Sequence, residues 1–521
     1  MAETKIIDER ITHFISQMMS DPVLSFNEKI LSSCVPEINQ YVSCVKVYDW
    51  GESVDKLIIN TGNSFINSEI NKESFRVFSA HSKFGKSESA GSEVVERTIT
   101  DIYFCDSLGN RSSKNSCYIA IELFSEPGNA EHGLFEKMLK SVGRSAFKSF
   151  IILNDEINLK ITKRTGTVHP LAGNFFPNEF KFQSGKESTN DVDIKLQYLY
   201  FRPENNNKIP LIIWLHGISE GGVNPYIPLM KIPAINLADK KIQGYFENGA
   251  ALLIPQCPVS WLQTTDKDAM GNNLWAPISK NMNSAMGTTL DVIAGILDPA
   301  KADNAKKSVS NTLSSAASGI FGKLLGGNSQ EQIKIIDYSK HFANVSLYTS
   351  CLKELIDKTI SENPQIDKDR IYIGGCSAGG YMTMNMILQY PDFFAAAFPV
   401  CEVYPDSKIT DSDIRNISDL PLWFSYSAFD TVVNPKTHSL ATYNRILNIG
   451  GHKVHICEFQ KITDITGKYN DETGRPHEYS GHESWIYVLN DFSEEDGVKL
   501  FDWLSKQTKK TGNRISLQAP R

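Results

Sequence analysis

The feature that most limits the fold of this chain is a repeated alternation of apolar, strand-like runs with helical stretches. It begins near residue 170, and its strand-like runs are 192–201, 211–215, 250–254, 371–374, 395–400, 420–427 and 453–459. The run 211–215 is apolar throughout, as is typical of a strand buried on both faces. Such strands separated by helices predict a mostly parallel sheet covered by helices on both sides. A further run at 179–183 is close enough to 192–201 for an antiparallel entry into the sheet.

The first third of the chain follows a different pattern. Residues 5–19 carry apolar side chains at helical spacing and predict an amphipathic helix within an N-terminal extension, residues 1–39. Short runs rich in Val, Ile, Tyr and Phe come next, separated by Gly, Asn, Ser and Asp, and they predict a small β-sandwich over 40–165. Residues 126–150 are expected to be helical or irregular. The second, α/β domain is expected over 170–521. The runs are 41–48, 56–60, 75–79, 98–104 and 117–124.

One segment fits neither pattern. Residues 283–330 are rich in Ala, Ser and Gly and would form an unusually long insertion in the α/β domain. Two interpretations stay open: a flexible surface insertion, or a mobile helical cap that acts as a lid over a site.

The composition of the chain limits the kinds of molecule that it is expected to bind. The chain has 521 residues, 41% of them hydrophobic and 22% charged, which is ordinary for a folded globular protein of two domains. The net charge of −7 argues against nucleic acid and anionic membranes as partners. We expect no membrane span, no secretory signal and no metal site, because there is no run of 18 apolar residues and the nine cysteines lack metal-type spacing. A cytoplasmic location is therefore predicted.

A candidate nucleophile lies in the second domain. Gly375-Cys376-Ser377-Ala378-Gly379 fits the pattern G-x-S-x-G. A strand-like run precedes it, and the residues after it have helical spacing up to Pro391. A strand, a tight turn and a helix in this order hold a serine hydroxyl above the edge of a sheet. Ser377 is therefore the predicted nucleophile.

A serine hydroxyl is a weak nucleophile until an imidazole accepts its proton. In such a sheet, the acid and then the histidine follow the serine at the ends of later strands. Asp430 follows the run 420–427, and His482 lies in the loop after 453–459. We predict that His482 serves as general base and then general acid, and that Asp430 holds its ring. Rival acids and one rival base lie nearby: Asp406, Asp411, Asp413 and His477.

Two backbone N–H groups should stabilise the oxyanion of the reaction. One is expected from Ala378, directly after the nucleophile, and the other from Gly217 or Ile218, after the strand 211–215. His216 is expected to be a structural hydrogen-bonding residue. Candidates for the wall of the substrate pocket, each tryptophan also having a plain core interpretation, are Trp261, Trp275, Glu402 and Trp485.

Several of these segments together resemble one family. They are His216-Gly217, the segment 255–258 (Pro-Gln-Cys-Pro), 375–380, 393–401 and 482–485. Over about residues 190–505 the chain is similar to the α/β-hydrolase "predicted peptidase or esterase" group, which is related to polyhydroxybutyrate depolymerases and feruloyl esterases. Segments 47–51, 75–77 and 99–106 look like the immunoglobulin-like domain that some bacterial esterases of this group carry. Departures from the group's pattern occur at Cys376, Ala378 and Cys401-Glu402.

The resemblance implies an α/β-hydrolase fold preceded by an immunoglobulin-like sandwich, and a Ser-Asp-His carboxylesterase that needs no cofactor. Its motif positions fall on Ser377, Asp430 and His482. The expected substrate is a small or aryl carboxylic ester. A serine peptidase with the same triad is one alternative; a protein with a silent hydrolase scaffold and a sandwich that binds a carbohydrate or a partner chain is another. The small domain is expected to shade the mouth of the site or to form a homo-oligomer.

Overall fold

The computed structural model describes two compact units, and each is considered by itself. The first contains strands β1 to β8 and the second contains β9 to α14. The predicted helix at 5–19 and the insertion 283–330 lie outside the described residues. Apart from a few single positions, the described ranges are 36–62, 75–82, 92–127, 148–153, 171–175, 183–188, 195–221, 225–262 and 346–509.

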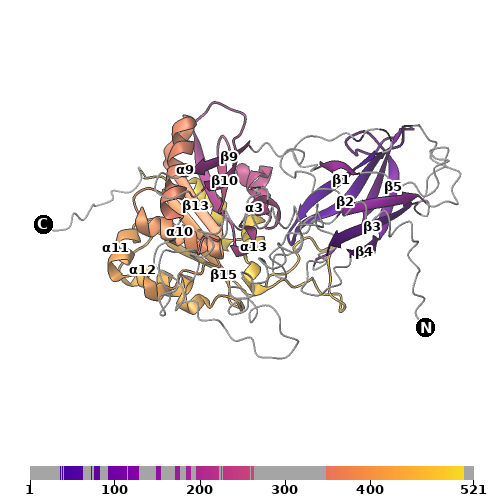
Figure 1. The fold of residues 1–521 in the computed structure, drawn as a ribbon. Helices are drawn as coiled ribbons and strands as arrows, with labels where there is room; N and C mark the ends of the chain where they lie inside the picture. Colours follow the sequence, from indigo (N-terminus) through magenta and orange to yellow (C-terminus); the bar gives the residue numbers. More distant parts are fainter. Residues whose placement is uncertain are drawn as a thin grey trace, which may run out of the picture. The chain divides into compact units, whose positions relative to one another are not determined.

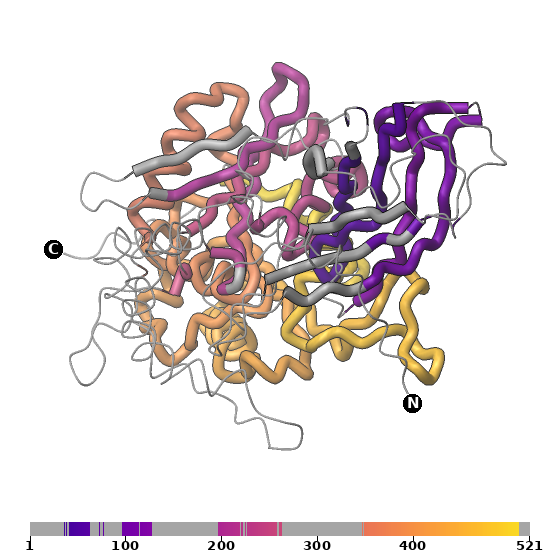
Figure 2. The backbone as a smooth tube through the Cα atoms, turned by 45° about the vertical axis from the view of Figure 1, so that its right-hand side comes forward, coloured from indigo at the N-terminus to yellow at the C-terminus, as the bar shows by residue number. Residues whose placement is uncertain are grey.

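The first unit is built from two β-sheets, as predicted (Figure 1). Figure 2 follows it as the indigo and purple part of the tube. One sheet has five strands in the order β5-β6-β2-β1-β8, and the other has three in the order β4-β3-β7. All neighbours pair antiparallel except β1 and β8. The strands are β1 (Gln40–Tyr48), β2 (Gly51–Asn60), β3 (Phe75–Ser82), β4 (Ser92–Arg97), β5 (Ile99–Cys105), β6 (Tyr118–Leu123), β7 (Lys148–Leu153) and β8 (Leu171–Phe175).

Two strands of this unit differ from the expectation. The interpretation of 126–150 as helical or irregular is wrong at its end, because β7 begins at Lys148. Strand β8 pairs parallel with β1, so the first unit continues to Phe175 instead of ending near 165. A strand of five residues that contains a glycine carries too little pattern to be recognised in the sequence, since its hydrogen bonds come from a partner far away in the chain.

The second unit contains an eight-stranded sheet in the order β16-β15-β14-β13-β11-β12-β10-β9. The six strands from β12 to β16 in this order run parallel, and β10 pairs antiparallel with both β12 and β9. This confirms the predicted mostly parallel sheet and its antiparallel entry. The strands are β9 (Gln183–Ser188), β10 (Lys195–Phe201), β11 (Ile209–Leu215), β12 (Ala251–Gln256), β13 (Ile366–Cys376), β14 (Ala396–Val400), β15 (Leu422–Ser427) and β16 (Val454–Phe459).

Helices and short connections complete the second unit. Among the residues that the structure describes, its α-helices are α3 (Ile227–Met230), α4 (Lys240–Gln243), α9 (Thr349–Glu362), α10 (Ala378–Gln389), α11 (Asp411–Ile417), α12 (Ser439–Asn448), α13 (Trp485–Leu489) and α14 (Leu500–Ser505). Its 3₁₀ helices are η4 (Ile218–Glu220), η5 (Ala234–Ala238), η8 (Asp406–Lys408), η9 (Pro435–Thr437) and η10 (Gly481–Glu483). Strands β17 (Glu494–Glu495) and β18 (Val498–Lys499) form a small hairpin.

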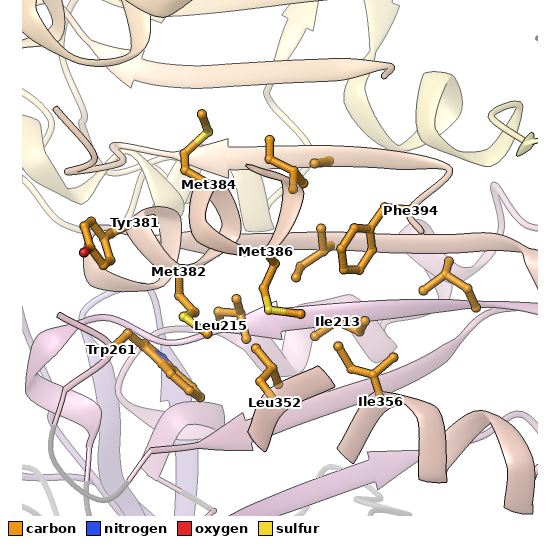
Figure 3. Close-up of a cluster of buried hydrophobic side chains, with 14 of the residues drawn as sticks. Ile213, Leu215, Trp261, Leu352, Ile356, Tyr381, Met382, Met384, Met386 and Phe394 are labelled. Carbon is orange, nitrogen blue, oxygen red and sulfur yellow. The ribbon is translucent and has the colours of Figure 1, made fainter. Parts of the chain in front are cut away.

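The central strand β11 is buried on both faces. Ile213 and Leu215 point toward side chains of α9 and α10 (Figure 3). The alternate residue Trp214 faces the other side, where its ring lies 6.0 Å from that of Phe398, which in turn packs against Phe501 of α14. All three β11 side chains are completely buried, and each stabilises the fold by about 1.5–3 kcal/mol. Burial on both faces explains why the run 211–215 does not alternate with polar residues.

None of the helices in the described residues combines the length and apolar character needed to cross a lipid bilayer.

Candidate active site

Ser377 lies in a strained turn between β13 and α10. Its backbone has φ of 54° and ψ of −115°, a conformation that residues with a side chain rarely adopt. The turn is held on both sides: the Ser377 N–H donates to the Val400 carbonyl at 2.9 Å, and its carbonyl accepts from the Tyr381 N–H at 2.9 Å. The hydroxyl is thereby fixed at the carboxyl edge of the sheet.

The two glycines of the motif allow β11 to approach this turn. A Cβ atom on Gly379 would lie 1.9 Å from the Leu215 carbonyl oxygen, and one on Gly375 would lie 2.5 Å from the same oxygen. No side chain fits at either position unless the strand moves. The pattern G-x-S-x-G is therefore a packing requirement between β11 and the turn as well as a signature of the nucleophile.

The structure places the three predicted catalytic side chains in one hydrogen-bonded chain. His482 Nε2 lies 2.9 Å from Ser377 Oγ, and His482 Nδ1 lies 2.8 Å from Asp430 Oδ2. Because a carboxylate only accepts hydrogen bonds, Nδ1 of the neutral ring carries the proton, and the lone pair of Nε2 faces the serine hydroxyl. The side chain of Asp430 is 1% exposed and that of His482 is 12% exposed. Bulk water therefore reaches these hydrogen-bonded side chains at the His482 end and hardly at all at Asp430.

Asp430 is oriented by its own loop. It follows β15, and its Oδ1 accepts hydrogen bonds from the N–H groups of Val432 and Val433 at 2.8 and 2.9 Å. These bonds hold one carboxylate oxygen and leave the other for His482. This arrangement satisfies the buried charge and keeps the ring in a single orientation.

The loop that carries His482 packs directly on the loop of Asp430. A Cβ atom on Gly481 would lie 2.3 Å from the Phe429 carbonyl oxygen and 3.0 Å from the Asp430 nitrogen. Ser480 also caps η10, because its Oγ accepts from the His482 N–H at 3.3 Å. Gly481 was not singled out in the sequence. Its place directly before the predicted base is the only signal that could have drawn attention to it.

The rival residues have other partners. Asp406 and Asp411 both pair with Arg445, at 3.0 and 2.7 Å. Asp413 accepts hydrogen bonds in the N-cap of α11. The ring of His477 packs edge-on against a neighbouring tyrosine at 4.9 Å. All four therefore have contacts that belong to the scaffold.

The two candidate oxyanion donors after β11 are the N–H groups of Gly217 and Ile218, and they differ in their hydrogen bonds. The Gly217 N–H donates to Oε2 of the buried Glu220 at 2.7 Å, so this donor is already engaged. Ile218 is then the better candidate for the second oxyanion donor. The Ala378 N–H lies in the first turn of α10, where amides have no carbonyl partner within the helix.

His216 orients the peptide that contains the Ile218 N–H. Its Nε2 accepts from the Cys257 N–H at 3.1 Å, so Nδ1 carries the proton and donates to the Gly217 carbonyl at 2.6 Å. The Gly217 carbonyl and the Ile218 N–H belong to one planar trans peptide and point in opposite directions. Holding the carbonyl therefore fixes the direction of the N–H. This agrees with the structural role expected for His216.

Glu220, which the sequence did not single out, gives a testable prediction. Glu220→Ala removes the acceptor that holds the Gly217 N–H and should let the η4 loop move. We expect kcat for a nitrophenyl ester to fall about tenfold with little change in KM, less than the 10²–10³ lost with a whole donor. Glu220→Gln keeps an acceptor oxygen and should retain most activity. An alanine variant with wild-type kcat would contradict this role.

Two of the predicted pocket residues do not line an open pocket. Trp261 is completely buried, and its ring packs against those of His216 and Tyr348 at 5.1 and 5.8 Å. Glu402 is also completely buried and accepts a hydrogen bond from Ser439 Oγ at 3.1 Å. Both predictions were wrong because an aromatic or acidic residue beside a strand end can face the core as readily as a cleft.

Trp485 lies beside His482. Its ring is partly exposed and meets the His482 ring edge-on at 5.6 Å. It therefore stays a candidate for the pocket wall. Trp275 lies outside the described residues. Within the described ranges, no group of three or more His, Cys, Asp or Glu side chains is arranged to hold a metal ion.

The buried Glu402 predicts a pH-dependent stability. Burial, assisted by the charge of Asp406, raises the pKa of the Glu402 carboxyl from 4.5 to about 8. The folded state therefore keeps a proton that the unfolded chain releases. This contribution to stability is complete below about pH 4.5 and is lost as the pH rises to about 8, at up to about 1.4 kcal/mol per pH unit. Melting temperatures of Glu402→Gln should show a flatter decline over this range, whereas the exposed control Glu494→Gln should follow the wild type.

Comparisons with known proteins match separate parts of the chain. The family model of the esterase Ig-like N-terminal domain matches residues 40–175, and that of the prolyl oligopeptidase family matches residues 351–420. Poly(3-hydroxyalkanoate) depolymerase C of Paucimonas lemoignei is 43% identical over 49 residues, or 9% of this chain. The chain thus spans only 12% of the length of this curated relative.

A likeness in structure covers almost the whole chain. The crystal structure of a thermostable esterase aligns with 90% of this chain and 100% of its own, with 19% sequence identity and a TM-score of 0.58. The chain has an α/β-hydrolase fold preceded by an immunoglobulin-like domain.

Proposed function

We propose that this α/β-hydrolase is a serine carboxylesterase that cleaves small or aryl carboxylic esters through an acyl-enzyme. The observation that carries the proposal is the hydrogen-bonded chain from Asp430 through His482 to Ser377, with distances of 2.8 and 2.9 Å. The strained turn at Ser377 supports it, because residues in such conformations gather at functional sites.

Acylation begins when Ser377 Oγ attacks the carbonyl carbon of the ester and its proton passes to His482 Nε2. The carbonyl oxygen becomes an oxyanion that accepts hydrogen bonds from the N–H groups of Ala378 and Ile218. Asp430 stabilises the imidazolium without taking its proton. His482 then protonates the leaving alkoxide as the bond between the carbonyl carbon and the ester oxygen breaks, and the acyl group stays on Ser377.

Deacylation repeats these steps with water. His482 Nε2 accepts a proton from a water molecule, whose oxygen attacks the acyl carbon. The oxyanion forms again against the same two donors. The proton on His482 passes to Ser377 Oγ as the acyl bond breaks, which releases the carboxylic acid and restores the site. The residues supply every proton transfer, so the proposed reaction requires no bound cofactor.

A fluorophosphonate probe tests the nucleophile directly. We expect the full-length protein to be labelled at Ser377 and hydrolysis of nitrophenyl esters to stop when labelling is complete. Ser377→Ala should abolish both, whereas Ser439→Ala, a buried serine that bonds Glu402, should keep the labelling. Labelling at another residue, or undiminished hydrolysis by Ser377→Ala, would overturn the proposal.

A serine peptidase is the second candidate. It is favoured by the match of residues 351–420, which include β13, the turn and α10, to the prolyl oligopeptidase family. Amide cleavage requires stronger protonation of the leaving group by the same His482. A panel of nitrophenyl esters and peptide anilides separates the two candidates: turnover of anilides alone would make the peptidase the correct assignment.

A further inference from the structure

A polar cavity in the immunoglobulin-like domain is lined by none of the triad residues. Its volume is about 420 Å³, within the range of small-molecule sites. The walls come from β1, β2 and β6, neighbours in the five-stranded sheet, and from the segments beside them. The side chains that matter for the argument are Lys46, Tyr48, Asp55, Lys56, Leu108 and Glu122.

A β-bulge turns an acidic side chain into this cavity. Cys44 of β1 pairs with Lys56, but the next residue, Val45, pairs with Val54, so Asp55 is the extra residue of β2. In a regular strand, Asp55 and Lys56 would point to opposite faces. Here both line the same cavity. Bulges commonly re-aim side chains beside functional sites.

The polar side chains that line the cavity hold one another in place. Tyr48 Oη donates to Asp55 Oδ2 at 3.0 Å, and Lys46 Nζ lies 4.7 Å from the centre of the Tyr48 ring. On the other side, Lys56 Nζ lies 3.6 Å from Glu122 Oε1. Glu122 also accepts from the hydroxyl of Tyr103 at 2.9 Å, and Arg111 stacks on that ring. The polar groups are therefore placed before any ligand arrives, which lowers the entropy cost of binding.

The charges of the cavity balance. Lys46 and Lys56 are offset by Asp55 and Glu122, so a bound ion would find no excess charge to neutralise. Ammonium groups only donate and carboxylates only accept, whereas a hydroxyl group does both. A molecule with several neighbouring hydroxyls could therefore bond to both kinds of wall group at once. The exposed Leu108 adds apolar surface, on which the C–H face of a sugar ring can pack.

We propose that this cavity is a binding site for a neutral saccharide of one to three rings. The sugar hydroxyls donate to Asp55 and Glu122 and accept from Lys46 and Lys56. The site is independent of the hydrolytic function proposed for Ser377, because all its residues belong to the immunoglobulin-like domain. An esterase with such a site would be held to a saccharide while its second domain acts on ester bonds.

Saturation-transfer NMR on the full-length protein tests the proposal. The probes are glucose, xylose, galactose and N-acetylglucosamine, with their β-1,4-linked dimers and trimers, and glycine as a zwitterionic comparison. At least one saccharide should receive saturation. Lys46→Ala and Asp55→Asn should each weaken its binding at least about fivefold, since each removes one charged hydrogen bond. Lys72→Ala, an exposed lysine of the same domain outside the cavity, should bind like the wild type.

Three outcomes would overturn the proposal: no saccharide receives saturation, glycine binds in their place, or both cavity variants bind saccharide as the wild type does. Because Lys46 is exposed, Lys46→Ala is expected to fold normally, and this can be checked by its melting temperature. Ester hydrolysis does not enter the measurement. Failure here would therefore leave the assignment of Ser377 untouched, and failure of the labelling experiment would leave the saccharide site untouched.

Discussion

Replacing His482 with alanine is expected to lower kcat for nitrophenyl esters by about 10⁴–10⁶, with a much smaller change in KM. The imidazole is the only side chain that the structure places within hydrogen-bonding distance of Ser377 Oγ among the described residues. Without it, the serine proton has no acceptor other than water, and the leaving alkoxide has no donor. The residual rate would come from the oxyanion donors and from substrate binding. Steady-state kinetics with one ester measures the effect.

His477 offers a matched control from the same loop. It lies five residues before His482, but its ring packs against Tyr479. His477→Ala should therefore change kcat by less than about threefold, an effect on stability or loop packing alone. For Asp430→Asn we expect a loss of kcat between those of the two histidine variants. The asparagine keeps a neighbour for the His482 ring but no longer supplies a carboxylate acceptor. Equal losses in the His477 and His482 variants would show that the loop, and not the imidazole, had been damaged.

The second large effect is expected from Gly481→Ala. The new methyl carbon would lie 2.3 Å from the Phe429 carbonyl oxygen, so the His482 loop must retreat from the Asp430 loop by most of an ångström. A misplacement of about 1 Å in a catalytic group costs about 10² in rate. We expect kcat to fall by about this factor while the protein stays folded, because Gly481 is half-buried in a loop and is not part of the hydrophobic core.

Gly474 is a stringent control for this variant. It lies in the same long loop with φ of 80°, and a Cβ atom there would meet nothing within 4 Å. Gly474→Ala therefore introduces backbone strain of about 1 kcal/mol without pressing on Asp430. Its kcat should match the wild type while its melting temperature falls slightly. If Gly474→Ala loses as much activity as Gly481→Ala, strain in the loop and not contact with Phe429 explains the loss.

Much of the fold was predictable because the sequence signals are local. Strand β11 is apolar at every position from 211 to 215, and burial on both faces is what such a run requires. The turn at Ser377 was equally predictable, because the strand, the two glycines of the motif and the helix follow one another directly in the sequence. In contrast, β8 depends on hydrogen bonds to β1, more than 100 residues away. No pattern within its own five residues indicates this pairing.

The side chains of the hydrogen-bonded chain could be predicted from the sequence, and the residues that hold them in place less so. Ser377, Asp430 and His482 could be selected from motif and strand order. Glu220 and Gly481 could not, because their roles depend on contacts across loops: one holds the Gly217 amide, and the other lets two loops touch. The prediction that Trp261 and Glu402 line the substrate pocket was wrong for a different reason. Their chemistry suits a pocket, but only the packing reveals that they face inward.

The two hydrogen bonds of His216 have a consequence for acidic solution. The ring can serve both neighbours only in one neutral form, with a bare nitrogen turned toward the Cys257 amide. A second proton would set two donors against each other at this contact. The contact that holds the η4 loop would then be lost, and with it the fixed direction of the Ile218 N–H.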